Sequence, residues 1–314
     1  MSCTSRSLPL LALLVPVLFG GMVMSPAQAQ QSREPEVEEV DLVSKDGVLI
    51  KANYYHGTED EDTVPVIVVH GEGGQRSELD GLAKALQKEG HAVLVPDLRG
   101  HGDSTRVQGR PDIKLDHEKM RPVEFSAAIN DIEACKKFFI KVNNEQKVNI
   151  ENLCLVGSGP LGSVLSFSYA GEDWLFRPFG RFKQGQDVKA VIMFSPVMRD
   201  KTIQAAGYMD DLSVMQEISY FMVVNNNSTS ASRDATRFED ALNRASRVKA
   251  DEKRIIRLDV PTTLEGASIL EVKESEEILR QVNAFIKLRV VDKNHEWKKR
   301  ERTGSSPIPF SQDK

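Results

Sequence analysis

Apolar residues recur along this chain in two alternating patterns, which predict strands and helices in turn. Short continuous apolar runs at 66–69, 153–156 and 188–194 are typical of strands that are buried on both faces. Longer segments separate them, at 122–139 for example, in which apolar residues recur every three to four positions, as on one side of a helix. Strands that alternate with helices in this way predict βαβ units and a mostly parallel sheet.

The rest of the pattern completes the expected fold. Segments 37–44 and 48–55 flank Lys45-Asp46-Gly47, and Asp-Gly is a hairpin turn signal, so we expect an antiparallel strand pair at the start. The expected class is therefore α/β, with a mostly parallel central sheet and helices on both faces. The remaining strands are expected at 91–95, 219–224 and 254–258, and the remaining helices around 79–86, 160–170, 235–245 and 278–286.

The first 29 residues have the pattern of a secretory signal peptide. Arg6 supplies a positive start, residues 8–24 form an apolar stretch, and Ala27-Gln28-Ala29 is a small-residue cleavage site. We expect cleavage near Ala29 and a bacterial protein that is periplasmic or secreted. Retention of the segment as an uncleaved membrane anchor is the alternative. No later apolar run is long enough to cross a bilayer, so we expect no stable membrane span after signal removal.

Composition divides the remaining chain into three parts. Residues 30–39 are rich in glutamate and predict a flexible acidic segment, and residues 40–290 carry the alternating pattern of one α/β domain. Residues 291–314 are highly charged and then rich in serine and proline, which predicts a disordered or loosely attached tail.

Charge and cysteine content exclude some classes of partner. The chain has 41 Lys and Arg residues against 46 Asp and Glu residues, and no basic stripe stands out, so we expect no nucleic-acid partner. Outside the signal peptide, Cys135 and Cys154 are expected on a helix and a strand as buried thiols, with a disulfide between them as the open alternative. No Cys/His spacing is typical of a metal site, and we expect neither a metal nor another cofactor.

Three segments make the chain resemble the α/β-hydrolase superfamily. They are His70-Gly71-Glu72-Gly73-Gly74 after one strand, the D-x-R-G-H-G-x-S segment 97–104 after the next, and the strand-to-helix turn 156–162. The resemblance covers roughly residues 40–290. It implies a serine-hydrolase fold in which a serine, an acid and a histidine follow one another along the chain. It also implies that Gly71 and Glu72 occupy the loop that helps to bind the oxyanion.

The strand-to-helix turn departs from the pattern Gly-x-Ser-x-Gly that this resemblance implies. Gly157 fits the first glycine, so the tip of the turn falls on Gly159, which has no side chain. The next residue should donate a backbone N–H to the oxyanion, and Pro160 has none. A shift by one residue would put Ser158 at the tip, but it would also put Val156 where the turn needs a small residue. We therefore expect a degenerate nucleophile elbow.

The acid and the base of the expected triad are also missing from their usual loops. The loop after the seventh strand carries three asparagines, 225–227, and Asp200 in the preceding loop could substitute for an acid. The loop after the last strand contains Glu265 and no histidine. Five of the six histidines precede the elbow, and His295 lies in the tail.

An insertion at 174–186 is the remaining candidate surface. Trp174, Phe176 and Phe179 lie close in sequence to Arg177, which suggests an apolar binding surface with a cationic rim. The alternative is that these aromatic residues fill the local core. Only residues 197–216 separate the sixth and seventh strands, so any cap over the site is minimal.

Three functional hypotheses follow. The first is an exported α/β-hydrolase-fold protein without hydrolase activity, which binds a small molecule or a protein partner. The second is an active ester or amide hydrolase that uses Ser158 with a non-histidine base, either Asp200 or Glu265. The third is a scaffold that acts through the insertion 174–186. The fold alone does not decide among them.

Overall fold

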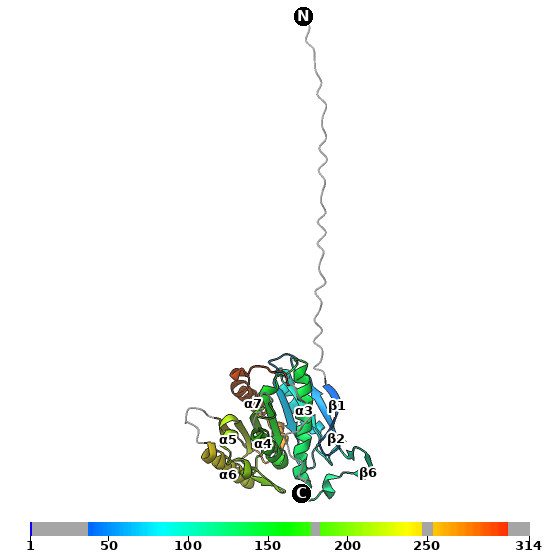
Figure 1. Cartoon of the computed structure of the whole chain (residues 1–314). Helices are drawn as coiled ribbons and strands as arrows, with labels where there is room; N and C mark the ends of the chain where they lie inside the picture. The colour runs from blue at the N-terminus through cyan, green and yellow to red at the C-terminus, as the bar shows by residue number, and fades with distance from the viewer. Residues whose placement is uncertain (2–36, 177–182, 247–253, 301–314) are drawn as a thin grey trace. The chain divides into compact units, whose positions relative to one another are not determined.

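The computed structural model describes residues 1, 37–176, 183–246 and 254–300. A ten-stranded sheet runs through this part of the chain (Figure 1). Its first strand, β1 (Val37–Val43), pairs with β2, and the other strands follow one another across the sheet as β12 (Ile255–Val260), β11 (Ser219–Asn225), β8 (Val188–Phe194), β7 (Leu153–Ser158), β3 (Pro65–Val69), β4 (Ala92–Pro96), β2 (Val48–Tyr55), β5 (Arg106–Val107) and β6 (Arg110–Lys114).

The sheet is mostly parallel, as the alternating pattern predicts. Every pair from β12 across to β4 is parallel, whereas β2 runs antiparallel to both β4 and β1. All residues of β3, β4 and β7 are buried, because helices cover both faces of the sheet. Because β3 and β7 are adjacent and parallel, their carboxyl ends lie side by side at the same end of the strands, where the loops that follow them meet.

Helices cover the two faces of the sheet in two groups. The core on one face includes residues of α3 (Ile129–Asn144), α4 (Gly159–Leu175) and α6 (Thr229–Ser246), and the core on the other includes residues of α1 (Asp80–Lys88) and α7 (Ser275–Arg289). Figure 1 shows α3 and α4 side by side across the sheet. The expected fold class is confirmed.

The connection between β8 and β11 is short, and no large cap is inserted there. It contains a hairpin of β9 (Arg199–Asp200) and β10 (Ile203–Gln204), followed by α5 (Leu212–Glu217). Among the described residues, no helix is both long and apolar enough to span a membrane. Residues 2–29 of the predicted signal peptide lie outside the described residues. Cys135 and Cys154 are both buried free thiols.

The beginning of the predicted tail is part of the fold, which corrects the expectation for residues 291–300. Arg300 is 7% exposed, and its guanidinium pairs with the buried carboxylate of Asp187 and, at 2.8 Å, with that of Glu151. A segment that buries its own charge in this way is not loosely attached. Three asparagine side chains also donate to its backbone carbonyls at 2.7–3.0 Å: Asn143 to Lys298, Asn144 to Arg300 and Asn149 to His295. The rest of the predicted tail lies outside the described residues.

Candidate active-site cavity

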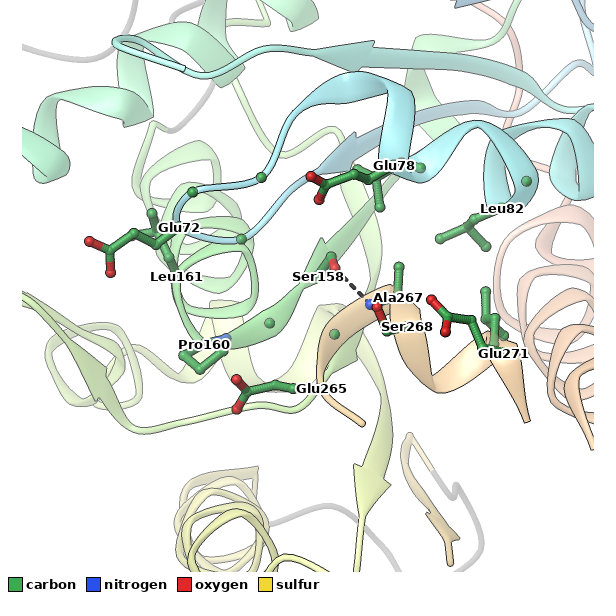
Figure 2. Close-up of a pocket in the computed structure, with 18 of the residues that line it drawn as sticks. Glu72, Glu78, Leu82, Ser158, Pro160, Leu161, Glu265, Ala267, Ser268 and Glu271 are labelled. Atoms are coloured by element: carbon green, nitrogen blue, oxygen red, sulfur yellow. Dashed lines mark hydrogen bonds between the residues drawn. The ribbon is translucent and has the colours of Figure 1, made fainter. Parts of the chain in front are cut away.

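A cavity of about 900 Å³ opens at the carboxyl ends of β3 and β7 (Figure 2). Three segments line most of it: the turn between β7 and α4, the loop after β3, and the start of the short 3₁₀ helix η6 (Gly266–Glu271). This is the edge at which ligands bind in open α/β sheets. Seven of the residues singled out in the sequence line this one cavity: Gly71, Glu72, Ser158, Gly159, Pro160, Asp200 and Glu265.

The backbone fixes the register of the strand-to-helix turn. Ser158 ends β7 in an extended conformation, with φ −103°, whereas Gly159 begins α4 with φ +69°. A positive φ favours glycine and marks the strained tip of such a turn. The tip is therefore Gly159, not Ser158. A Cβ added to Gly159 would have only the Cα of Gly71 nearby, at 3.7 Å, so the tip has room for a side chain that it lacks.

The loop after β3, which would help to bind the oxyanion, still packs against this turn, although the set of oxyanion donors is incomplete. A Cβ on Gly71 would lie 3.2 Å from the carbonyl oxygen of Ser158, so a larger residue here would have to push the two segments apart by a few tenths of an ångström. Pro160, the residue after the tip, has no N–H to donate. Figure 2 shows the Glu72 side chain turned away from Ser158. The Glu72 carboxylate instead pairs with the Lys201 ammonium at 2.6 Å.

The Ser158 hydroxyl holds a neighbouring loop in place. Its Oγ accepts a 2.8 Å hydrogen bond from the backbone N–H of Ala267, drawn as a dashed line in Figure 2. The residue is only 7% exposed. Within the described ranges, neither a histidine nor a carboxylate is hydrogen-bonded to this hydroxyl. The bond to Ala267 therefore gives Ser158 a structural partner in the place of a general base.

The position expected for the acid carries an amide that belongs to the same set of contacts. Asn225 ends β11, and its Oδ1 accepts a hydrogen bond from the Ser195 hydroxyl at 3.1 Å. The Ser195 oxygen in turn accepts from the backbone N–H of Gly266, also at 3.1 Å. Asn225 and Ser195 thus hold the loop that follows β12. An active serine hydrolase of this fold would use an aspartate or glutamate here to orient a histidine.

The loop after β12 fills the space beside the tip. Gly266 has φ +60°, and a Cβ there would come within 2.6 Å of Ser158 Oγ and 2.8 Å of the Gly159 nitrogen. The loop therefore packs its own backbone directly on the elbow. No larger side chain fits at this position without displacing that contact.

His70, although next to the oxyanion loop, does not replace the missing base. Its Nδ1 donates to the carbonyl of Gly71 at 2.6 Å, and its Nε2 accepts from the backbone N–H of Leu98 at 2.9 Å. Burial lowers the pKa of His70 to about 3, so the imidazole is neutral near pH 7. Both ring nitrogens are already used, which leaves none to take a proton from a nucleophile.

Asp200 and Glu265 both reach the cavity, and neither is hydrogen-bonded to Ser158. Asp200 is half-buried at the end of β9, where burial, aided by the nearby Glu72 carboxylate, raises its pKa. Glu265 is exposed and lies beside Pro160 in Figure 2. Two further carboxylates line the cavity, Glu78 and Glu271, and the sequence reasoning missed both. The sequence offered one signal for them: each lies in the connection that follows a parallel strand, β3 for Glu78 and β12 for Glu271.

Trp174 and Phe176, the described aromatic residues of the insertion 174–186, do not line this cavity. Trp174 is 8% exposed, and its indole N–H donates to the carbonyl of Val188 at 2.7 Å. Phe176 is partly buried against the same core. The expectation of a binding surface is corrected for Trp174, whose ring lies in the core, and Phe176 packs against that core, as the alternative predicts. Arg177 and Phe179 lie outside the described residues.

The strand order, the elbow and the glycine-rich loop after β3 define a protein of the α/β-hydrolase superfamily. Comparison with family models places it further. The model described as serine aminopeptidase, S33, matches residues 61–255, and the chain belongs to this family. No curated protein matches the sequence.

Solved structures with the same fold include several esterases. An esterase of Pyrococcus furiosus, Pf2001, superposes with a TM-score of 0.60 at 16% identity, over 82% of this chain and 92% of that one. An esterase of Pyrobaculum calidifontis gives 0.56 at 14% identity, over 81% and 85%. A fungal esterase of Rhizomucor miehei gives 0.58 at 15% identity, over 83% and 86%. At these identities the likeness shows the fold alone.

Proposed function

We propose that this chain is an exported α/β-hydrolase-fold protein without hydrolase activity, which uses the cavity above the degenerate elbow to bind a ligand. The observation that carries the proposal is the left-handed backbone of Gly159, which puts a residue without a side chain at the nucleophile position. The hydrogen bond from Ala267 to Ser158 supports it, because the nearest hydroxyl has a structural role.

The size of the expected loss supports inactivity. Removing one member of a serine triad lowers kcat by about 10⁴-fold or more, and removing one oxyanion donor lowers it by about 10²–10³-fold. Gly159 removes the nucleophile, and Pro160 removes a backbone donor. In addition, the loop after β12 presents Glu265 and Gly266 where the fold would carry its histidine. What remains is a cavity that binds rather than turns over a substrate.

The proposed location outside the cytoplasm rests on the sequence of residues 1–29. The positive start, the apolar stretch and the Ala27-Gln28-Ala29 site together are the usual signature of an export signal. Fractionation of the native host, with N-terminal sequencing of the mature protein, tests this part. An N-terminus at Gln30 in the periplasm or medium is expected, and a cytoplasmic full-length protein would contradict it.

The proposal of inactivity is tested by chemistry at Ser158. The purified mature protein should not be labelled by a fluorophosphonate probe, nor should it hydrolyse p-nitrophenyl esters of several chain lengths. The control is Ser158→Ala, which should behave identically in both assays. Labelling or turnover that disappears in Ser158→Ala would show an active serine hydrolase and overturn the proposal. Ligand binding to the cavity is tested separately by thermal shift, since a ligand at 100 times its Kd adds about 2.7 kcal/mol to stability.

A further inference from the structure

A groove between helices α1 and α7 meets the cavity and leads away from the elbow. It has a volume of about 680 Å³, and Leu279 lines both the groove and the cavity. Residues near the start of the two helices line the cavity, whereas residues further along them line the groove: Gly81, Leu82 and Ser275 against Ala85, Lys88, Ala284 and Lys287. The groove therefore runs from Leu279 towards the ends of both helices, and α7 rises about 12 Å between Leu279 and Lys287. Ligand sites in proteins have this size.

The far end of the groove carries a buried histidine whose ring has no partner. His91 follows α1, lines the groove and is 7% exposed, and its backbone N–H donates to the carbonyl of Leu86 at 3.3 Å. In the part of the chain that the structure describes, no group is hydrogen-bonded to its ring nitrogens. Burial lowers the pKa of His91 to about 4, so near pH 7 the ring is neutral and offers one N–H donor and one nitrogen acceptor. Buried polar groups are normally hydrogen-bonded, so this ring is available to a molecule in the groove.

The charges at the rim of the groove give it no dominant sign. Three cationic side chains and two carboxylates line it: Lys88, Arg280, Lys287, Glu89 and Glu276. Arg280 pairs with Glu277, and Lys287 pairs with Asp292, so two of the three cations are already neutralised. Asn283 also lines the groove, and its buried Oδ1 has no hydrogen-bond donor among the described residues. A charged head group would lose its hydration beside these buried neutral groups, and the balanced rim favours neither sign. The groove therefore favours a neutral head group.

The remaining lining of the groove suits an aliphatic chain. Its apolar residues are Ala85, Leu279, Ala284 and Val291, of which Val291 is 40% exposed. The long side chains at the rim add their methylene stems, which cover apolar surface. Within the described ranges, no phenylalanine, tyrosine or tryptophan lines the groove, so it offers no such ring on which an aromatic ligand could stack. An aliphatic ligand therefore fits better than an aromatic one.

We propose that the groove between α1 and α7 is a second binding site, for a neutral aliphatic chain that ends in a hydroxyl group. The hydroxyl, which can both donate and accept, hydrogen-bonds to a ring nitrogen of His91. The chain runs from there along Ala85 and Leu279 towards the cavity. None of the described residues of the elbow lines the groove, so this inference does not depend on whether the elbow is active.

The experiment measures the binding of 1-octanol to the mature protein by isothermal titration calorimetry. His91→Phe keeps a ring but removes both hydrogen-bonding atoms, so it should weaken binding by about fivefold. Ala85→Trp fills the groove and should abolish binding. Lys84→Trp is its matched control, because this exposed neighbour on α1 does not line the groove. Octanoate and octylamine have the same chain length but a charged head group, and each should bind about tenfold more weakly than octanol because the charge is desolvated.

NMR of the imidazole rings locates the bound octanol. The ring signals of His91 should shift when octanol is added, and those of His56, which lies outside the groove, should not. Thermal unfolding of each variant shows whether it is folded. If Ala85→Trp does not fold, His91→Phe and the NMR shift decide the test.

Several outcomes would overturn the inference. They are the absence of octanol binding, unchanged ring signals of His91, full affinity in His91→Phe, an equal loss in Lys84→Trp, or octanoate or octylamine binding as tightly as octanol. Fluorophosphonate labelling is measured separately in the same samples. Labelling that depends on Ser158 would contradict the proposed function and leave the octanol site untouched, whereas a failure to bind octanol leaves the proposed function standing.

Discussion

The backbone N–H of Ala267 donates a 2.8 Å hydrogen bond to the hydroxyl of Ser158. This contact joins the loop after the last strand, where the fold would carry a catalytic histidine, to the strand that would carry the nucleophile. The adjacent Gly266 N–H donates to the hydroxyl of Ser195, just after β8, so two consecutive residues of the loop are fixed, one to the elbow and one to the end of β8. The Ser158 hydroxyl, the nearest one to the position of the nucleophile, thus stabilises the fold. Its removal should lower the free energy of unfolding and leave catalysis unchanged.

Ser158→Ala should lower the free energy of unfolding by about 1 kcal/mol, because the Ala267 N–H loses its acceptor. Urea unfolding followed by circular dichroism measures the change. Ser268→Ala is the matched control, since that serine also lines the cavity but is exposed, and its effect should stay within about 0.5 kcal/mol. Equal effects of the two substitutions would contradict the structural role of Ser158.

Gly159→Ser should restore a hydroxyl at the tip without restoring activity. The site has room for the side chain, and the positive φ should cost about 1–2 kcal/mol of stability. Gly159→Ala carries the same backbone cost without the hydroxyl and serves as the control. Neither variant should react with a fluorophosphonate, because the base and the N–H at Pro160 are still missing. Labelling of Gly159→Ser alone would mean that the rest of the machinery is intact.

Gly266→Ala should destabilise the protein by more than about 2 kcal/mol, because the new Cβ meets Ser158 Oγ and the Gly159 nitrogen at a positive φ. Gly81→Ala is the same substitution in helix α1, where a Cβ meets no atom within 4 Å. It should stabilise by about 0.5–1 kcal/mol, because alanine loses less backbone entropy in a helix. Chemical denaturation of both variants tests the pair. A tolerated Gly266→Ala would show that the loop does not press on the elbow.

Arg300→Met should cost about 1.5–3 kcal/mol, because charged hydrogen bonds to Asp187 and Glu151 are lost while Lys136 and Lys183 still pair with Asp187. Burial alone would raise the pKa of Asp187, but the charges of Lys136, Lys183 and Arg300 hold it well below its usual value. A carboxyl group whose pKa is lowered by folding stabilises the fold at pH values above the pKa that it has in the unfolded chain. This stabilisation is lost as the pH falls, so the destabilisation caused by Arg300→Met should be smaller in acid. Lys298→Met, on an exposed neighbour, is the control and should change little. Urea titrations at pH 7 and in acid measure both.

His70→Asn should flatten the dependence of stability on pH in the acid range. Burial lowers the pKa of His70 to about 3, while the unfolded chain takes up this proton near pH 6.5. The wild type therefore loses stability as pH falls from about 6.5 towards 3, by up to about 1.4 kcal/mol per pH unit from this group. Urea unfolding between pH 7 and 4 should show a shallower slope in the variant. Parallel slopes would contradict a buried neutral His70.

The sheet and most of its helices could be predicted from the sequence, because buried parallel strands and amphipathic helices have distinct periods. The expected 48–55 and 188–194 match β2 and β8 at both ends. The hairpin of β5 and β6 was missed, since these strands are short and largely exposed and carry no apolar run. The docked residues up to Arg300 were missed for a related reason: a charged segment reads as solvated unless its buried partners are known.

The sequence by itself determined what the elbow lacks. Gly159 has no side chain and Pro160 has no N–H, and both absences are covalent facts that no tertiary contact can change. Only the tertiary structure decided what took the place of the chemistry. The hydrogen bond between Ser158 and Ala267 and the acidic wall around it join segments more than a hundred positions apart. Such segments come together only through the order of the parallel strands in the sheet. Local sequence patterns do not show which distant segments will be neighbours.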